Sequence, residues 1–369
     1  MIARAASTLY TAATAWRRRW YARYPSRQRH LERPVVSVGN LAVGGSGKTP
    51  VAEYVARLLL DHGERPAILT RGYGRRVATD GVTVVSDGTA IRAAIETAGD
   101  EPLMLAQALP GVCVLVGADR YRSGCLAERR FGATVHVLDD GFQHLALARD
   151  VDLLLVSEED LADRPLPAGR LREPLAAAAW ADAVLVTARY PAAVERIARA
   201  LGARTAFGVT RVLGAPRRMA LPRESVVVPP QSRVFALAGV ARPGRFFSDI
   251  EAAGWRVVGT QAFGDHHRFS QSDITRIARA AKSSTAAIVL TTEKDAVRLA
   301  ACDLGDLPIA SVPLSVAIDP ADAFRDWLLA RIHAARASSL APSHQPPLAS
   351  DAGERRPGSP ERRRREGGP

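Results

Sequence analysis

Cysteine is nearly absent from the sequence, and long apolar runs are missing. The 369 residues include 3 Cys, which are odd in number and widely spaced. They form no disulfide framework and no metal-ligand pattern, and their scarcity suits a reducing compartment. No stretch approaches the roughly 18 consecutive apolar residues of a membrane-spanning helix. The N-terminus also lacks the continuous apolar segment of a secretory signal, so we expect neither a transmembrane span nor secretion.

Lysine is almost as rare, although the chain has a net charge of +12. Among its 50 Lys and Arg residues, the lysines are Lys48, Lys282 and Lys294. Where arginine is the default cation, a lysine can mark a site that needs a compact ammonium group. Codon bias and chance explain the count equally well, so the scarcity alone does not decide between the two.

The positive charge is concentrated at the two ends. Residues 1–33 hold eight Arg and one Glu, and residues 334–369 hold seven Arg and four acidic residues. A nucleic-acid enzyme more often carries its basic stripe on the folded body, and Arg-rich ends bind polyanions weakly and lose them with salt. A basic nucleic-acid-binding protein is therefore an alternative, but no specific nucleic-acid partner is expected.

Residues 2–23 have the pattern of a basic amphipathic helix, because apolar residues recur three or four positions apart. Such a helix can lie in the surface of an anionic membrane. The alternative is a helix that packs on its own domain and turns a basic side to solvent. The apolar face comprises Ile2, Ala5, Leu9, Ala12, Trp16 and Trp20, and the flanking cations are Arg17, Arg18, Arg19 and Arg23.

Short apolar runs alternate with helical patterns along most of the chain. Several runs are apolar on both faces, as in "VDLLLVS" at 151–157, which is typical of buried parallel strands. The pattern predicts an α/β fold, a doubly wound, mainly parallel sheet with a second, smaller α/β domain. We expect an N-terminal helix over 1–33, the larger domain over 34–210, the smaller one over 211–336, and a disordered Arg- and Pro-rich tail over 337–369.

The stretch "AVGGSGKT" follows one of these strands and precedes a helical pattern, which is the context of a phosphate-binding loop (P-loop). Its glycines let backbone N–H groups converge on phosphate oxygens. Lys48 would reach the β- and γ-phosphates, and the hydroxyl of Thr49 would bind Mg²⁺. Alanine replaces the usual first glycine, a mild change if φ is negative. The predicted nucleotide-binding residues are Ala42, Val43, Gly44, Gly45, Ser46, Gly47, Lys48 and Thr49.

Two adjacent carboxylates, Asp139 and Asp140, end the apolar strand of "VHVLDDGFQH". Ligands gather at the carboxyl ends of strands in α/β sheets, and a carboxylate there can hold Mg²⁺ directly or through water. "DDG" is also good turn chemistry. With a P-loop in the same chain, we interpret the pair as functional.

Three weaker stretches add candidates for a general base, which a kinase that acts on a hydroxyl requires. They are "GDEP" with Asp100 and Glu101, "FGDHHRFS" with Asp265, His266 and His267, and "LREP" with Arg172 and Glu173. Each alone is ordinary surface polarity, and the pattern does not choose among them.

Together these stretches resemble the tetraacyldisaccharide 4′-kinases, the lipid A 4′-kinases of Gram-negative bacteria. The resemblance covers roughly residues 1–330, and its motifs occur in the order of that family. "DDGFQH" with the offset P-loop is highly specific, and the family tolerates a small residue at the Ala42 position. The remaining motifs are "RGYGR" (71–75), "GDEP" (99–102), "GADRYR" (117–122), "LREP" (171–174), "FGDHHRF" (263–269) and "TTEKDAVRL" (291–299).

The resemblance implies an ATP- and Mg²⁺-dependent kinase that phosphorylates the 4′-hydroxyl of tetraacyldisaccharide 1-phosphate to give lipid IVA, in lipid A biosynthesis. It implies a smaller domain that closes a cleft over the nucleotide, and a peripheral location on the cytoplasmic face of the inner membrane, where the lipid substrate lies.

The resemblance also implies roles for individual residues. Asp100 and His266 would act together as the base; we choose His266 over His267 because it directly follows Asp265. Lys48 and Asp140 would complete the catalytic set. The metal ligands would come from Thr49, Asp139 and Glu173, Arg172 and Arg120 would neutralise phosphate charge, and Tyr73 would pack near the nucleotide.

Another P-loop enzyme is the main rival, either a small-metabolite kinase or a membrane-associated ATPase of the partitioning type. Those ATPases usually carry an extra lysine early in the loop, where this chain has Ala42, Val43 and Gly44. Neither this rival nor a nucleic-acid-binding protein accounts for "DDGFQH" and "DHH" together.

Overall fold

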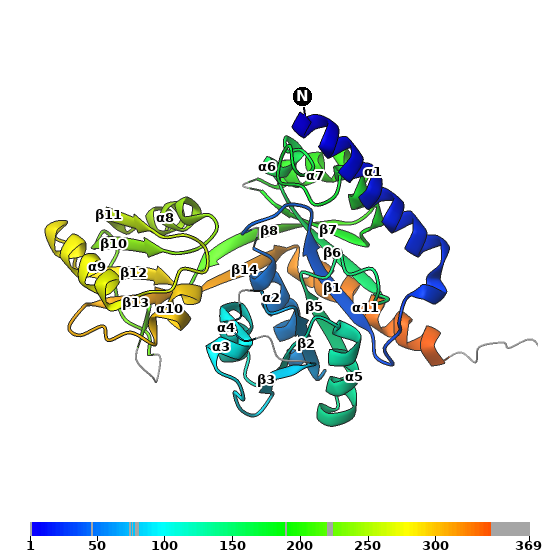
Figure 1. Cartoon of the computed structure of the whole chain (residues 1–369), viewed down its shortest axis with the longest axis horizontal. Coiled ribbons are helices and arrows are strands. Elements are labelled where there is room, and N and C mark those ends of the chain that lie inside the picture. The colour runs from blue at the N-terminus through cyan, green and yellow to red at the C-terminus, as the bar shows by residue number, and fades with distance from the viewer. Residues whose placement is uncertain are drawn as a thin grey trace, which may run out of the picture.

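Short buried strands assemble into a sheet of nine strands among the described residues (Figure 1). The computed structural model describes residues 2–340, apart from 46, 74, 76, 78–80, 189 and 220–223. The strand order is β14-β8-β7-β6-β1-β5-β2-β4-β3. Pairing is parallel from β8 to β4, whereas β3 and β14 add antiparallel edges. The strands are β1 (Val35–Asn40), β2 (Pro66–Thr70), β3 (Thr83–Asp87), β4 (Cys113–Val116), β5 (Val135–Asp139), β6 (Val151–Ser157), β7 (Ala183–Thr187), β8 (Ala206–Leu213) and β14 (Leu314–Asp319).

Helices cover both faces of this sheet, because successive strand residues point to opposite sides. In β1, Val36 and Val38 join the buried cluster of α2, α4 and α11, whereas Val35 joins that of α5. Helix α7 packs on the same side as α5, through the alternate residues of β6 and β7. The predicted doubly wound α/β sheet is therefore confirmed. The helices and 3₁₀ turns of this part are η1 (Pro25–Arg27), α2 (Lys48–Asp61), α3 (Ile95–Ala98), α4 (Asp100–Ala108), α5 (Arg120–Phe131), α6 (Glu158–Leu161), η2 (Leu175–Trp180), α7 (Pro191–Ala200) and α11 (Ala321–Leu340).

A smaller sheet, with the order β11-β10-β12-β13-β9, stands beside the first (Figure 1). It is parallel apart from the short edge strand β9. Val234 and Ala236 of β10 pack with α8, and the alternate residues Phe235 and Leu237 pack with α9 on the other face. The elements are β9 (Arg217–Arg218), β10 (Arg233–Ala238), α8 (Pro243–Ala252), β11 (Arg256–Ala262), α9 (Gln271–Ser283), β12 (Ile288–Thr292), α10 (Glu293–Leu299) and β13 (Ile309–Val312).

The C-terminal elements return to the larger sheet, so the predicted boundaries need correction. β14 pairs antiparallel with β8, and Phe324, Leu328 and Ile332 of α11 are buried in the larger core. Residues 314–336 therefore do not belong to the smaller domain, which is inserted between β8 and β14. Helix α11 continues to Leu340, beyond the predicted start of the tail at 337. The rest of the predicted tail, 341–369, lies outside the described residues.

The two domains contact each other where helix α10 packs against helix α4. Val297 of α10 is buried in the larger core, whereas Leu299 belongs to a core cluster of the smaller domain. The first turn of α4 carries Asp100 and Glu101. Helix α10 therefore holds the smaller domain against the part of the larger domain where candidate catalytic residues lie.

Gly39 in β1 allows the loop after β5 to approach the strand closely. A Cβ at Gly39 would lie 2.4 Å from the Cβ of Phe142 and 2.8 Å from its backbone nitrogen. We expect Gly39→Ala to lower the free energy of unfolding by about 1–3 kcal/mol, measured by urea denaturation. The control is Gly244→Ala in α8, where a Cβ meets nothing within 4 Å. Equal effects of the two substitutions would contradict this close packing.

Candidate active site

The predicted P-loop connects the central strand β1 to the N-terminus of α2. Gly44 and Gly47 adopt positive φ values of 95° and 92°, which favour glycine. Lys48 is the first residue of α2 and Thr49 the second, so both lie at a helix terminus whose N–H groups and dipole attract phosphate. Ser46 lies outside the described residues. The described part of the loop is therefore compatible with the predicted phosphate-binding loop.

The start of the loop is tied to the segment that carries the "LREP" motif. The N–H of Val43 donates to the carbonyl of Arg170 (2.8 Å), and the N–H of Arg172 donates to the carbonyl of Leu41 (2.6 Å). Ala42 is 1% exposed and its methyl group lies in a buried apolar cluster. The alanine at this position is thus a packing residue of the core.

Asp140, directly after β5, lies between two cations. Its carboxylate accepts hydrogen bonds from Arg172 at 2.8 and 2.9 Å and lies 3.5 Å from the ammonium of Lys48. Burial works to raise the pKa of Asp140, but the charges of Lys48 and Arg172 outweigh it and hold the pKa below its ordinary value. Lys48 also donates to the side-chain oxygen of Asn40 at 2.9 Å. The carboxylate of Asp140 therefore positions the lysine that would contact phosphate.

Asp139 is a buried carboxylate, and one of its two oxygens is unpaired within the described residues. It is 4% exposed, and its Oδ1 has no hydrogen-bond partner among the described residues. Burial and the nearby negative charges of Glu101 and Asp140 raise its pKa to about 7. A bound cation would neutralise the buried carboxylate of Asp139 and lower its pKa. The oxygen donors of Asp139, Asp140 and Thr49 suit Mg²⁺.

Within the described ranges, no cluster of three or more His, Cys, Asp or Glu side chains is arranged to hold a metal ion. A P-loop magnesium site does not need one, because Mg²⁺ usually keeps several waters and binds one or two carboxylates together with substrate phosphates. The residues present therefore fit Mg²⁺.

Glu173, predicted to be a metal ligand, has a different partner. Both of its oxygens accept hydrogen bonds from Arg18 of the N-terminal helix at 2.7 Å, and Oε1 also accepts one from Gln143 at 3.1 Å. The Glu173 side chain is 6% exposed. A buried carboxylate with a bidentate arginine is already neutralised, so in this arrangement Glu173 pairs with Arg18, and its role as a metal ligand stays a prediction.

Asp100 and His266 come together from different domains. Asp100 is the first residue of α4, and His266 lies in the loop after β11 with a positive φ of 58°. The Nδ1 of His266 is 3.0 Å from the Oδ2 of Asp100. His267 instead lies 3.1 Å from Asp273, within the smaller domain. Of the two histidines, His266 is thus the one beside Asp100.

The hydrogen bond to Asp100 raises the pKa of His266 above its ordinary value, although burial and the charge of Lys294 oppose it. Burial works to raise the pKa of Asp100, but the bond to His266 and the charge of Lys294 outweigh it and lower that pKa. The carboxylate and the imidazolium therefore stabilise each other.

Lys294 and Arg298 surround this pair, and sequence reasoning did not assign them to the site. Lys294 on α10 contacts Glu101 at 2.9 Å and Asp265 at 3.1 Å, and its nitrogen is 3.5 Å from the Nε2 of His266. The Nε of Arg298 lies 3.5 Å from the Oδ2 of Asp100. The scarcity of lysine and the "TTEKDAVRL" motif were the available signals for Lys294.

The other candidates lie nearby. Arg120, at the start of α5, is 6% exposed; burial and the charge of Arg71 lower its pKa, and Asp140 and Asp139 oppose this change. Tyr73 is 72% exposed, and its ring centre is 5.4 Å from that of His266. Arg120 therefore lies near the paired carboxylates, and Tyr73 lies against the histidine.

Comparison with known proteins identifies the family. The LpxK family model, described as tetraacyldisaccharide-1-P 4′-kinase, matches residues 1–333. The chain belongs to this kinase family. It is 41% identical over 302 residues to the tetraacyldisaccharide 4′-kinase of Desulfotalea psychrophila, covering 79% of this chain and 86% of that protein. It is 40% identical over 329 residues to the enzyme of the same name from Koribacter versatilis, covering 88% and 96%.

A solved structure agrees with this assignment. The crystal structure of LpxK from Aquifex aeolicus in complex with ATP matches with a TM-score of 0.70 and 31% sequence identity. The match covers 88% of this chain and 97% of that one. The predicted family and fold are confirmed. The roles of single residues stay predictions.

Proposed function

We propose that this chain transfers the γ-phosphate of ATP to the 4′-hydroxyl of tetraacyldisaccharide 1-phosphate, giving lipid IVA in lipid A biosynthesis. The family and the names of its relatives support the reaction, and the ATP complex of the Aquifex aeolicus relative supports the donor. The observation that carries the assignment of the site is the hydrogen bond between Asp100 and His266, at the junction of the two domains.

The donor side would be held by the P-loop and the N-terminus of α2. Backbone N–H groups around Gly44, Gly45 and Gly47 would surround the β-phosphate, and Lys48 would reach the transferred group. Arg172, already paired with Asp140, would add positive charge at the same edge of the sheet. Mg²⁺ held by Thr49 and Asp139 would neutralise charge on the β- and γ-oxygens.

The acceptor side would be served by Asp100 and His266. A hydroxyl attacks phosphorus more readily when a base accepts its proton in the transition state. The carboxylate orients the imidazole through Nδ1 and stabilises the imidazolium that forms. Lys294 and Arg298 lie close enough to hold Asp100 ionised.

The reaction is tested by transfer of label to lipid. Purified protein, Mg²⁺ and tetraacyldisaccharide 1-phosphate in detergent micelles would receive either γ-labelled or α-labelled ATP. We expect labelled lipid from the γ-labelled ATP alone. Release of labelled inorganic phosphate without labelled lipid would contradict the lipid as the acceptor. Labelled lipid from α-labelled ATP would contradict the γ-phosphate as the transferred group.

The activity should depend on pH through the Asp100–His266 pair. The base accepts a proton only after the imidazolium has lost its own, so kcat/KM should rise with pH through a midpoint above the ordinary histidine pKa of about 6.5. Asp100→Asn removes the carboxylate that raises the pKa of His266, while burial and Lys294 still lower it. We therefore expect a lower maximum rate and a midpoint at lower pH. An unchanged midpoint would contradict the coupling.

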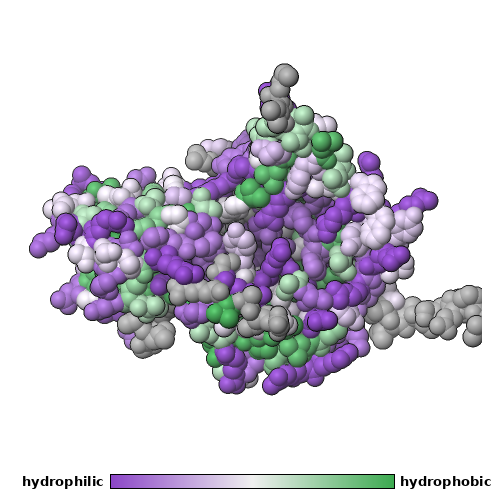
Figure 2. All heavy atoms as spheres, in the orientation of Figure 1, coloured by the Kyte–Doolittle hydropathy of each residue, from purple (hydrophilic) through white to green (hydrophobic). Residues whose placement is uncertain are grey.

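We further propose that helix α1 (Ile2–Arg23) docks on the membrane surface. Leu9 and Trp16 on its predicted apolar face are 73% and 66% exposed, and Figure 2 shows hydrophobic residues beside hydrophilic ones along this helix. A packed helix would bury that face, so the exposure favours the membrane alternative. In the part of the chain that the structure describes, every helix is too short or too polar to cross a bilayer.

Removal of the exposed apolar side chains should weaken this docking. We expect Leu9→Gln and Trp16→Gln each to lower partitioning to anionic phospholipid vesicles about tenfold, because less apolar surface leaves water. ATP affinity should not change. The control is Val227→Gln, a substitution at an apolar residue that is 90% exposed elsewhere. Equal partitioning of all three variants in sedimentation assays would exclude α1 as the docking element.

A further inference from the structure

Arg18 differs from the other arginines of helix α1 because it is buried. Its side chain is 4% exposed, and its Nε and Nη2 donate to the two oxygens of Glu173 at 2.7 Å each. Nη2 also donates to the carbonyl of Phe142 at 3.1 Å, and the guanidinium lies 4.2 Å from the centre of the Phe142 ring. This planar, two-pronged contact requires arginine, since the ammonium of lysine cannot reproduce it.

The pair continues as a chain of polar contacts to the P-loop. Gln143 donates to Glu173 at 3.1 Å and accepts from Arg172 at 3.3 Å. Arg172 in turn holds Asp140 at 2.8 Å, and Asp140 lies 3.5 Å from the ammonium of Lys48. A side chain of the N-terminal helix is thereby connected with the lysine that would contact the transferred phosphate.

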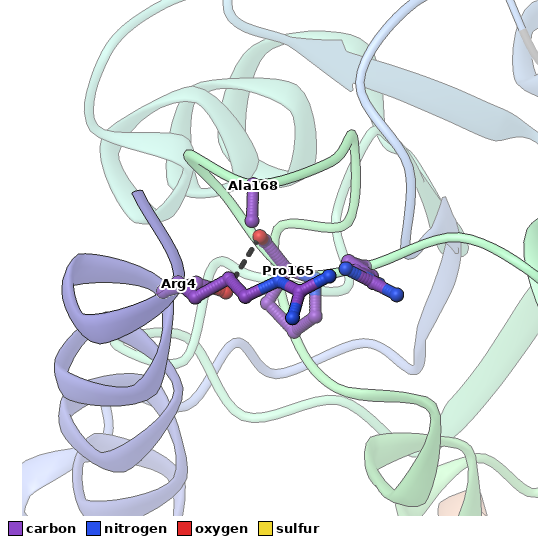
Figure 3. Close-up of a pocket in the computed structure, with 5 residues that line it drawn as sticks. Arg4, Pro165 and Ala168 are labelled. Carbon is purple, nitrogen blue, oxygen red and sulfur yellow. Dashed lines mark hydrogen bonds between the residues drawn. The ribbon is translucent and has the colours of Figure 1, made fainter. Parts of the chain in front are cut away.

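Helix α1 is attached to the body of the protein by polar contacts. The hydroxyl of Ser7 donates to the carbonyl of Pro165 at 2.8 Å (Figure 3), beside a surface cavity of about 280 Å³. Ser7 and Arg18 are three turns apart and share a face. No α1 residue belongs to the buried apolar clusters found among the described residues. The helix is therefore held by polar contacts of Ser7, Arg17 and Arg18, of which the Arg18–Glu173 pair is the buried, charged one.

We propose that Arg18 is a positioning residue for phosphate transfer. Through its contact with Glu173, Arg18 couples the position of α1 to the geometry of the active site. Glu173 then fixes Gln143 and Arg172, and these keep Asp140 beside Lys48. The proposal rests on the kinase function proposed above. It assigns to the docking helix a second task, which is to hold the donor site in its active geometry while the helix is in place.

The first test compares kcat in micelles for variants of α1. Arg18→Met should lower kcat about 10- to 100-fold, because small displacements of positioned groups have effects of this size. The kcat of Arg18→Lys should lie between those of Arg18→Met and the unmodified protein. The matched control is Arg4→Met, which removes the same charge from an exposed position of the same helix and should leave kcat unchanged. Wild-type kcat per folded molecule in Arg18→Met would overturn the proposal.

A double substitution covers the case in which Arg18→Met fails to fold because it leaves a buried carboxylate unpaired. Arg18→Met/Glu173→Gln removes both charges and should melt closer to the unmodified protein. Its kcat should stay at least tenfold below that of the unmodified protein, and its KM for ATP should change less than its kcat. A double variant with normal kcat would mean that the pair serves stability alone, and would overturn the proposal.

The two proposals fail in different ways. If the unmodified protein transfers no label to the lipid, the kinase function fails. If the unmodified protein labels the lipid and the Arg18 variants label it at the same rate, the positioning role of Arg18 fails while the kinase function stands.

Discussion

Replacing Lys48 with alanine is expected to lower kcat for phosphate transfer by roughly 10³-fold. Its ammonium is held by Asn40 and Asp140 at the start of α2, the place where charge would develop on the transferred group. Loss of a positioned charge that acts mainly in the transition state lowers kcat more than it raises the KM for ATP. Steady-state kinetics at saturating lipid measures both constants.

The control for this prediction is Lys282→Ala, which removes an exposed lysine from the end of α9. Its kcat should equal that of the unmodified protein. If Lys48→Ala is folded and retains more than about a tenth of the unmodified activity, the P-loop lysine is not part of the mechanism.

The second large effect is expected at the Asp100–His266 pair. Asp100→Ala and His266→Ala should each lower kcat by about 10²–10⁴-fold, the usual contribution of a general base. Because the two side chains share a hydrogen bond at 3.0 Å, their effects should not multiply, and the double variant should be about as slow as the slower single variant.

The control here is His62→Ala at the exposed end of α2, where no change in kcat is expected. A strictly multiplicative loss in the double variant would show that Asp100 and His266 act independently, and the cooperating pair would have to be abandoned.

Buried strands were the most predictable part of the fold. The runs at 35–40 and 151–157 match β1 and β6, because apolar residues on both faces mark a strand inside a parallel sheet. Strands β8, β9 and β14 were harder to predict, since their exposed positions carry Arg, Ser and Thr. Nothing local indicates that β14 pairs with β8, about 100 residues earlier, so the domain boundary was placed wrongly.

The candidate site was predictable where its residues lie in one motif. The P-loop and the Asp139–Asp140 pair follow from spacing and strand context. The pairing of Asp100 with His266 joins residues 166 positions apart, and only the family resemblance suggested it. No local pattern indicates the partner of Glu173, because Arg18 is 155 residues away. Lys294 was not assigned because its place depends on the packing of α10 against α4.

The most direct test of the central claim is the position of the new phosphate on the lipid. Product labelled from γ-labelled ATP would be treated with mild acid, which removes a phosphate from the anomeric carbon and leaves a phosphate on an ordinary hydroxyl. We predict that the label stays on the disaccharide while the unlabelled 1-phosphate is released. Release of the label, or its absence from the lipid, would contradict the assignment of this chain as a 4′-kinase.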